Sequence, residues 1–329
     1  MKLRKERQLN AVSDEVLALT AVVRPILTGV LYGLKKDVVA EVGGYADVKV
    51  KMLPRLIRPS DGDVGVCFEY AVHEAMNSGD AKVLNRIEDA LKLCKVPAGD
   101  ARSILFGIEK SGAVQLIDTA KEILGSDSRV LTGGVGQPPK LSKHLTTIAG
   151  AFRNRRTRLA LPSSIQRLWK AALFVGTPNS ERWVGATVKN NPNDLEGAAG
   201  LRIGIIPVRS GRTDKVRMDD QKNLIICPLL HDGDFMQTFY EGWRIVQAFL
   251  HADAQVPKEV LLPRPEHREV TRILAERREF PVVEVVEALE AFAQPELLIT
   301  DTERVEQESV KGTIATDLLI APVSREVQP

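Results

Sequence analysis

The sequence predicts an α/β protein in which a central mixed sheet is flanked by helices, with additional helices before and after the sheet. Two observations predict this fold class. Residues 1–124 carry helix patterns that turns interrupt, whereas residues 173–228 contain four short runs that are apolar or alternate in polarity. Helical spacing returns from residue 235 onward. With 44% hydrophobic and 27% charged residues in a chain of 329, the composition is that of a globular protein with a substantial core.

The amino-terminal part of the chain is predicted to be helical and interrupted. Ser13 begins a helix, and Gly43-Gly44 and Pro54 break the helical pattern later. A turn at Asp61-Gly62-Asp63 leads into the next helix. The helices predicted after this turn are Val64–Asn77, Ala81–Leu93 and Ala113–Leu124.

The remainder of the chain is predicted to hold the sheet and three later helices. The strands are Leu173–Val175, Trp183–Lys189, Leu201–Val208 and Leu224–Pro228. The helices are Phe235–Ala252, His267–Arg277 and Val282–Phe292. Leu318-Leu319-Ile320 is expected to add a late strand or to dock. The chain therefore divides into a helical segment over 1–60, an α/β core over 61–255, and a helical segment with a tail over 256–329.

Charge and cysteine content bound the functional class only loosely. The 45 basic and 43 acidic residues give a net charge of +2, so nucleic-acid affinity would have to come from local clustering. Cys67, Cys94 and Cys227 are widely spaced, which favours reduced thiols in the cytoplasm. The apolar run Val16–Leu34 contains Arg24 near its middle, so we expect a helix of a soluble protein and no membrane span.

Two loops carry residue types that bind ions, but a structural role is predicted for both. Gly133–Lys140 is rich in glycine, yet it lacks the Gly-Lys-Ser/Thr ending of a phosphate-binding loop, and its two prolines remove N–H donors. Asp232 and Asp234 lie between a strand and a helix, where turn formation and helix capping explain them. The five histidines show none of the usual zinc-site spacings.

A cluster of four arginines follows in the segment 151–158. Within the six positions 153–158, four are arginines (Arg153, Arg155, Arg156 and Arg158) and none is acidic. Guanidinium groups make bidentate contacts with phosphate, so the cluster predicts a nucleic-acid-binding surface. The alternative is a solvated helix face with surface ion pairs.

An acidic residue on an early helix and a later strand hairpin form the most informative pattern. Glu69 lies among apolar residues in Val64–Asn77. Ala171-Ala172-Leu173-Phe174-Val175 begins the hairpin, and its second strand ends in Thr187-Val188-Lys189. Because side chains alternate along a strand, Thr187 and Lys189 are expected on one face.

This order resembles the PD-(D/E)XK, or restriction endonuclease-like, nuclease superfamily. That family carries a helix acid, then a strand that opens with Pro-Asp, then a strand that ends in acid-x-Lys. Here Glu69 matches the helix acid, Ala172 stands where the Asp is expected, and Thr187-Val188-Lys189 takes the place of the last motif. The resemblance covers about residues 64–252 and implies that 61–255 is a nuclease-like core.

The resemblance implies a metal-dependent DNA endonuclease of restriction or phage defence, often a homodimer. Residue 172 and Glu69 would hold Mg²⁺ or Mn²⁺, Thr187 would orient a metal-bound water, and Lys189 would stand beside the nucleophile and the phosphate. Because alanine offers no oxygen ligand, the site is expected to be impaired at Ala172. Either the chain is a natural relative that only binds DNA, or residue 172 has been changed to disable an enzyme.

Two other functional classes stay open at this point. The first is a non-catalytic DNA-binding component of a defence or restriction system, which would use the arginine cluster without a metal. The second is a structural or protein-interaction module with no role in nucleic-acid binding.

Overall fold

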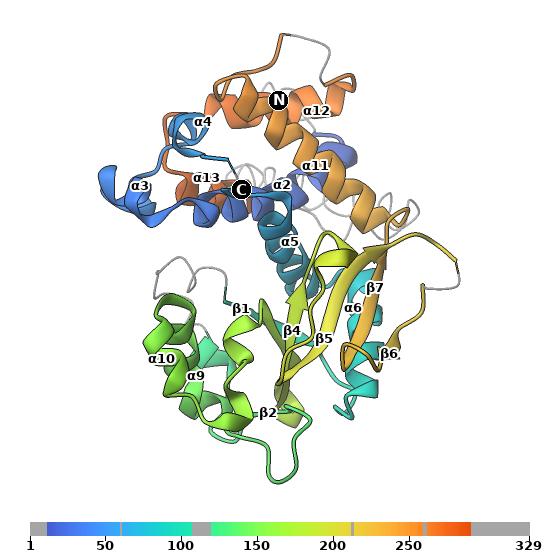
Figure 1. Ribbon diagram of the computed structural model, residues 1–329. Helices are drawn as coiled ribbons and strands as arrows, with labels where there is room; N and C mark the ends of the chain where they lie inside the picture. Colours follow the sequence, from blue (N-terminus) through green and yellow to red (C-terminus); the bar gives the residue numbers. More distant parts are fainter. Residues whose placement is uncertain (1–11, 60, 107–119, 212–213, 259–261, 291–329) are drawn as a thin grey trace, which may run out of the picture.

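The computed structural model describes residues 12–59, 61–106, 120–211, 214–258 and 262–290. It confirms an α/β fold with a mixed sheet flanked by helices (Figure 1). The seven strands are β1 (Arg102–Leu105), β2 (Arg129–Val130), β3 (Leu173–Thr177), β4 (Arg182–Val188), β5 (Leu201–Val208), β6 (Arg217–Asp219) and β7 (Leu224–Leu230).

The sheet combines antiparallel and parallel pairs in the order β1-β3-β4-β5-β7-β6. β3 and β4 form an antiparallel hairpin, whereas β4, β5 and β7 run parallel to one another. The edge strands β1 and β6 pair antiparallel with β3 and β7 respectively. β2 pairs with the first two residues of β4, ahead of the point where β5 begins to pair with it. The four predicted strands thus lie in one sheet, as expected.

One face of the sheet is covered by a thick layer of helices. The larger hydrophobic cluster joins Val184, Ala186 and Val188 of β4 to buried residues of these helices. Phe68 and Phe239 are fully buried there, with ring centroids 5.2 Å apart. We call this side the thick face. Its helices are α2 (Asp14–Gly33), α5 (Val64–Ser78), α6 (Ala81–Leu93), α11 (Asp234–His251), α12 (Pro265–Glu276) and α13 (Val282–Glu290).

Local sequence signals account for the ends of these helices. Ser13 accepts a hydrogen bond from Val16 N at the start of α2, and Asp63 accepts one from Val66 N at the start of α5. Gly79 ends α5 in the left-handed conformation that glycine adopts without steric cost. Helices of the predicted terminal segments, α2, α12 and α13, share the cluster with α5 and α11 of the predicted core segment. Four short helices lie between α2 and α5 in the sequence: α3 (Lys36–Glu41), η1 (Tyr45–Asp47), η2 (Val50–Met52) and α4 (Leu53–Leu56).

Helix α2 is long and apolar enough to cross a membrane, but it lies in the core. In its most apolar window, 72% of the residues are buried inside the protein. Arg24, near its middle, bonds with Glu74 of α5 at 2.8 Å. This charged group is paired inside the protein, so α2 has the surroundings of a core helix.

The other face of the sheet, the thin face, carries a smaller cluster. It is built around Trp183 and Phe174, which point away from the thick face. Its cover includes α9 (Leu141–Arg153), η3 (Ser163–Ile165) and η4 (Leu168–Lys170). The short helix α10 (Arg155–Leu159) packs beside α9 and has no buried residue. In Figure 1, α9 and α10 lie beside the β1 side of the sheet.

Several elements escape sequence prediction because they are short or lack a clear period. β1, β2 and β6 have two to four residues each, too few for an alternating pattern to stand out. Residues 113–119 of the predicted third helix lie outside the described residues, as does the predicted segment 318–320. Two short 3-10 helices connect strands of the sheet. The helix η5 (Pro178–Ser180) joins β3 to β4, and η6 (Pro192–Asp194) lies between β4 and β5.

Candidate nucleic-acid interface

Thr187 and Lys189 meet in a pocket at the carboxyl end of β4. Alternation along β4 places Thr187 on the thin face, opposite Ala186 and Val188. Lys189 follows the strand, and its N–H donates to Ile205 O at 3.0 Å. The pocket has a volume of about 480 Å³. Its lining is Phe152, Trp169, Lys170, Thr187, Lys189, Asp194, Glu196 and Leu201, and we call it the carboxyl-end pocket.

An arginine of the predicted cluster reaches this pocket through Trp169. The guanidinium carbon of Arg158 lies 3.7 Å from the centroid of the Trp169 ring, within cation–π distance. Arg158 Nε also donates to Ala151 O at 3.0 Å, which fixes the stack against α9. The cluster is therefore attached to the pocket lining by a defined contact.

The other arginines of the cluster lie on or beside the same short helix. Arg155 and Arg156 are exposed, and within the described chain neither side chain has an ion-pair partner. Arg155 precedes Arg158 by three residues, so both side chains occupy one face of α10. Asn154 caps α10 by accepting from Arg156 N at 2.9 Å. The side chain of Arg153 lies outside the described residues.

Two carboxylates in the carboxyl-end pocket were missed by sequence reasoning. Asp194 and Glu196 come from the irregular connection between β4 and β5. Glu196 pairs with Lys170 at 3.8 Å, while Lys189 has no ion-pair partner within the described residues. The pocket therefore holds a paired and an unpaired lysine beside an aromatic ring. Only their position shortly after Lys189 in the sequence could have drawn attention to the two acids.

Ala172 does not join Thr187 and Lys189 in the pocket, which corrects the prediction. Its side chain is 1% exposed and belongs to the cluster of the thick face. Ala172 N donates to Ala186 O at 2.8 Å, while Leu173 is the register partner of the same Ala186. Two residues thus oppose one, as in a β-bulge, and both Ala172 and Leu173 contact the thick-face cluster.

Glu69 also lies away from the pocket, so its predicted place beside Lys189 is wrong. It is half-buried on α5, whose apolar residues pack on the thick face, whereas Lys189 opens on the thin face. Other acids do not replace it. Glu74 pairs with Arg24 of α2, and Glu181 precedes β4 at the opposite end from Lys189.

The residues present do not form the predicted magnesium site. Within the described parts of the chain, no three His, Cys, Asp or Glu side chains come together in a group that could hold a metal ion. Ala172 offers no ligand atom, and Glu69 belongs to the other face. The role of these two residues as metal ligands therefore has no geometric support.

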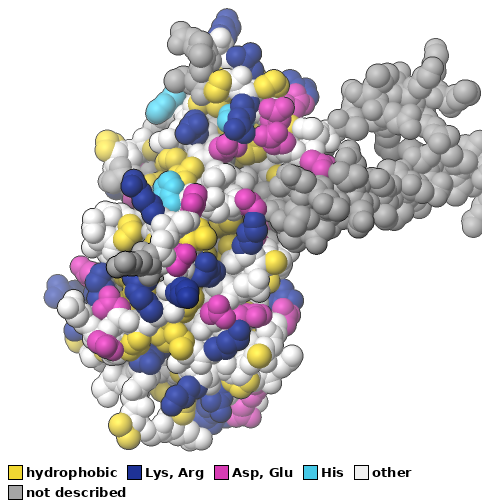
Figure 2. All heavy atoms as spheres, turned by 90° about the vertical axis from the view of Figure 1, so that its right-hand side faces the viewer, with side chains coloured by type: hydrophobic (Ala, Val, Ile, Leu, Met, Phe, Trp, Pro, Cys, Tyr) yellow, Lys and Arg dark blue, Asp and Glu magenta, His cyan; other side chains and the backbone are white. Residues whose placement is uncertain are grey.

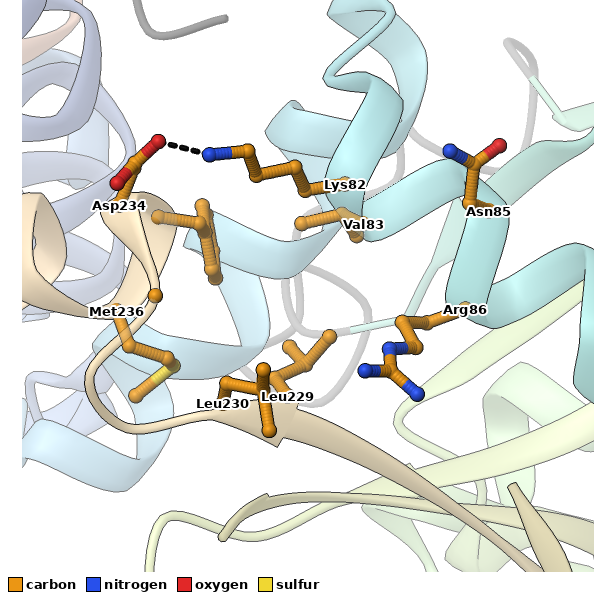
Figure 3. A pocket seen from close by; sticks show the side chains of 10 residues that line it. Lys82, Val83, Asn85, Arg86, Leu229, Leu230, Asp234 and Met236 are labelled. Carbon is orange, nitrogen blue, oxygen red and sulfur yellow. Dashed lines mark hydrogen bonds and ion pairs between the residues drawn. The ribbon is translucent and has the colours of Figure 1, made fainter. Parts of the chain in front are cut away.

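A separate apolar pocket of about 280 Å³ lies between the starts of α6 and α11 (Figure 3). Lys82 and Asp234 form an ion pair at its edge, and Arg86 donates to Asp214 O at 2.7 Å. Asp232 instead accepts from Ser210 Oγ, so Asp232 and Asp234 do not converge on a cation. The charged groups here already have partners, and the rest of the lining is apolar apart from Asn85.

Charges of both signs mix on one side of the molecule. Figure 2 shows basic and acidic side chains interspersed on the side where β6 lies, with no field of one sign. Arg155 and Arg156, which have no ion-pair partner among the described residues, belong to α10, near the β1 side of the sheet.

Comparisons of the chain with protein-family models, curated proteins and solved structures returned no match. The interpretation of the carboxyl-end pocket therefore depends on its residues and their geometry.

Proposed function

We propose that this protein binds DNA through the sugar-phosphate backbone, with α10 and the carboxyl-end pocket as the contact surface. The observation that carries the proposal is the stack of Arg158 on Trp169, because it joins the arginine cluster to the pocket that contains Lys189. Arg155 and Arg156 would bind phosphates beside it, since guanidinium groups recognise phosphate oxygens through paired hydrogen bonds.

The composition of the surface favours backbone contacts over reading of base sequence. Cations that bind phosphates position a protein on DNA but carry little sequence information. Trp169 is partly exposed and lines the pocket, so a flipped or single-stranded base could stack near it. We therefore expect affinity that depends strongly on salt and weakly on sequence.

Salt dependence of binding tests this function. A labelled 20-base-pair duplex and a single strand of the same length are titrated with the protein at several salt concentrations. Four to five phosphate contacts would give a slope of about −4 in log K against log salt for the duplex. Two duplexes of unrelated sequence should bind within about threefold of each other, because phosphate contacts dominate. A flat salt response would contradict the proposal.

Metal-dependent hydrolysis of the bound phosphodiester is the second candidate function. One observation favours it: Lys189 shares its pocket with Asp194 and Glu196. Proteins often hold Mg²⁺ with one or two carboxylates together with substrate phosphates. Plasmid DNA incubated with the protein and Mg²⁺ or Mn²⁺ should then be cut, and Asp194→Asn should abolish cutting. If the protein binds the DNA but does not cut it with either metal, hydrolysis is excluded and DNA binding is the only one of the two functions that stands.

The setting that we propose for this function is a cytoplasmic defence or restriction system. The buried, unpaired thiols of Cys67, Cys94 and Cys227 suit a reducing compartment. The homodimer that the family resemblance implies is part of this proposal and is measurable by light scattering.

A further inference from the structure

A second pocket lies at the amino end of β4, and we call it the amino-end pocket. It has a volume of about 400 Å³, within the range of small-molecule sites. Its walls are the end of α6, the glycine-rich loop 131–139 and the first residues of β4 and β5. Arg182 at this end and Lys189 at the other are separated by about 23 Å of extended strand, so the two pockets are distinct.

Three cations line the amino-end pocket, and its described lining includes no Asp or Glu. Lys95, Arg182 and Arg202 come from three different elements. Lys95 and Arg182 are exposed and, within the described chain, have no ion-pair partner. This setting differs from the carboxyl-end pocket, where Glu196 pairs with Lys170. Converging cations without a counter-charge attract an anion.

The glycine-rich loop, which lines the same pocket, carries N–H groups without a hydrogen-bond partner in the described part of the chain. Its base is pinned, because Leu131 N donates to Trp183 O at 2.8 Å and Arg129 donates to Pro138 O at 2.8 Å. Between these anchors, the N–H groups of residues 132–137 have no hydrogen-bond partner within the described chain. Free backbone N–H groups of this kind bind phosphate oxygens.

Gly133 lets the loop approach Arg202 closely. Gly133 has φ +74°, and a Cβ at this position would collide with the Arg202 guanidinium. The loop backbone therefore lies directly against a cation, in a conformation that other residues adopt only with strain. The two prolines that discouraged a phosphate-binding role follow this stretch and leave its donors intact.

The last carbonyl groups of α6 are already hydrogen-bonded, so they do not repel an anion in the pocket. A helix carboxyl terminus normally exposes carbonyl groups that repel negative charge. Here Ala90 O, Leu91 O and Lys92 O accept from the N–H groups of residues 94, 96 and 95. Lys95 adopts a left-handed conformation at this cap, so a positive side chain follows the helix end.

The rim of the pocket is apolar and open to solvent. Leu93 is 51% exposed, and the side chain of Val135 is fully exposed. Both line the pocket, on α6 and on the loop respectively. The combination of cations and exposed apolar side chains in one lining matches a ligand with a phosphate end and a flat apolar end.

We infer that the amino-end pocket binds a nucleoside diphosphate or triphosphate. The phosphates contact Arg182, Arg202 and the N–H groups of the glycine-rich loop, and the base lies against Leu93 and Val135. This inference does not depend on DNA binding, because none of these residues belongs to α10 or the carboxyl-end pocket.

Calorimetric titration of the full chain tests the inference, with ATP, sodium tripolyphosphate and adenosine as probes. ATP should bind in a saturable one-to-one manner, tripolyphosphate more weakly because it lacks the base, and adenosine at least about tenfold more weakly than ATP. Arg182→Ala should weaken ATP binding about tenfold, since the exposed arginine is removed without disturbing the core. Gly133→Val keeps all three charges and should also weaken ATP binding, because valine at φ +74° strains the loop and displaces the Arg202 guanidinium.

Two controls separate this site from general charge effects and from the DNA surface. Arg209→Ala removes an exposed arginine just after β5, the strand that carries Arg202, and should leave ATP affinity unchanged. Arg155→Ala with Arg156→Ala should also leave it unchanged. Equal ATP affinity in Arg182→Ala and the parent protein, adenosine binding as tight as ATP, or displacement of ATP by duplex DNA would overturn the inference.

Discussion

The two faces of the sheet differ in how much of their surface is available to a ligand. On the thick face, α2, α5 and α11 bury Ala172 together with Val184, Ala186 and Val188 of β4 in a continuous apolar cluster. On the thin face, short helices cover the sheet incompletely, and Thr187 and Lys189 open into a pocket. Residues that neighbour each other along one hairpin therefore have opposite surroundings.

The two faces separate the residues that the nuclease family pattern would bring into one site. Ala172 and Glu69 lie on the side that stabilises the fold, whereas Thr187 and Lys189 lie on the side that can meet a substrate. The comparison predicts that substitutions on the thick face mainly change stability. Substitutions on the thin face should mainly change binding.

The largest effect is expected for Ala172→Asp. A carboxylate at this position would be buried in an apolar cluster without a partner, which should destabilise the fold by about 5 kcal/mol. Thr187→Asp places the same group beside Lys189 and Lys170 and should cost less than about half as much. Urea unfolding of both variants measures the difference. Metal-dependent DNA cleavage by a folded Ala172→Asp protein would show that residue 172 reaches the pocket after all.

Phe68→Ala should destabilise the protein by about 3–5 kcal/mol, because it leaves a cavity beside Phe239 in the thick-face cluster. Trp169→Ala on the thin face should cost less, since its side chain is only partly buried. DNA affinity should change in the opposite order. Trp169→Ala should weaken DNA binding, whereas Phe68→Ala should leave DNA affinity unchanged at a temperature where the variant is folded. Equal losses of DNA affinity in the two variants would remove the distinction between the faces.

His73 on the thick face should make stability depend on pH. Its Nδ1 lies 2.6 Å from Ser103 Oγ, and burial lowers the pKa of the imidazole to about 4. The unfolded chain binds this proton near pH 6.5, so stability should fall as the pH is lowered from about 6.5 to 4, by up to about 3 kcal/mol. Below that window this contribution should level off.

A variant without the titrating group isolates the contribution of His73. His73→Gln should unfold with a smaller pH dependence between about pH 6.5 and 4. Urea unfolding at four pH values measures both slopes. Parallel slopes in the variant and the parent protein would assign the pH dependence to other groups.

The sequence predicted the sheet far better than the site. Apolar runs bounded by Gly, Pro and Asn identify β4, β5 and β7. These strands are buried on both faces of the sheet, so nearly all of their side chains are apolar. The side on which Ala172 lies depends on a local two-to-one pairing with β4, which no periodicity reveals. Asp194 and Glu196 could not be assigned to the pocket either, because they come from an irregular loop whose path depends on tertiary contacts.

The amino-end pocket illustrates the same limit. Gly133–Lys140 lacks a known phosphate-binding motif, and Arg182 and Arg202 stand 20 residues apart in the sequence. Only the parallel pairing of β4 with β5 brings the two arginines to one end of the sheet.

Binding of duplex DNA by an arginine double variant tests the central claim most directly. Arg155→Ala with Arg156→Ala removes two cations from the thin side. Arg55→Ala with Arg244→Ala removes two exposed arginines from α4 and α11 as a charge-matched control. The first pair should weaken binding by about tenfold or more and reduce the salt slope by about 2, whereas the control pair should change neither. Equal affinity and slope in the two double variants would contradict the assignment of this surface to DNA.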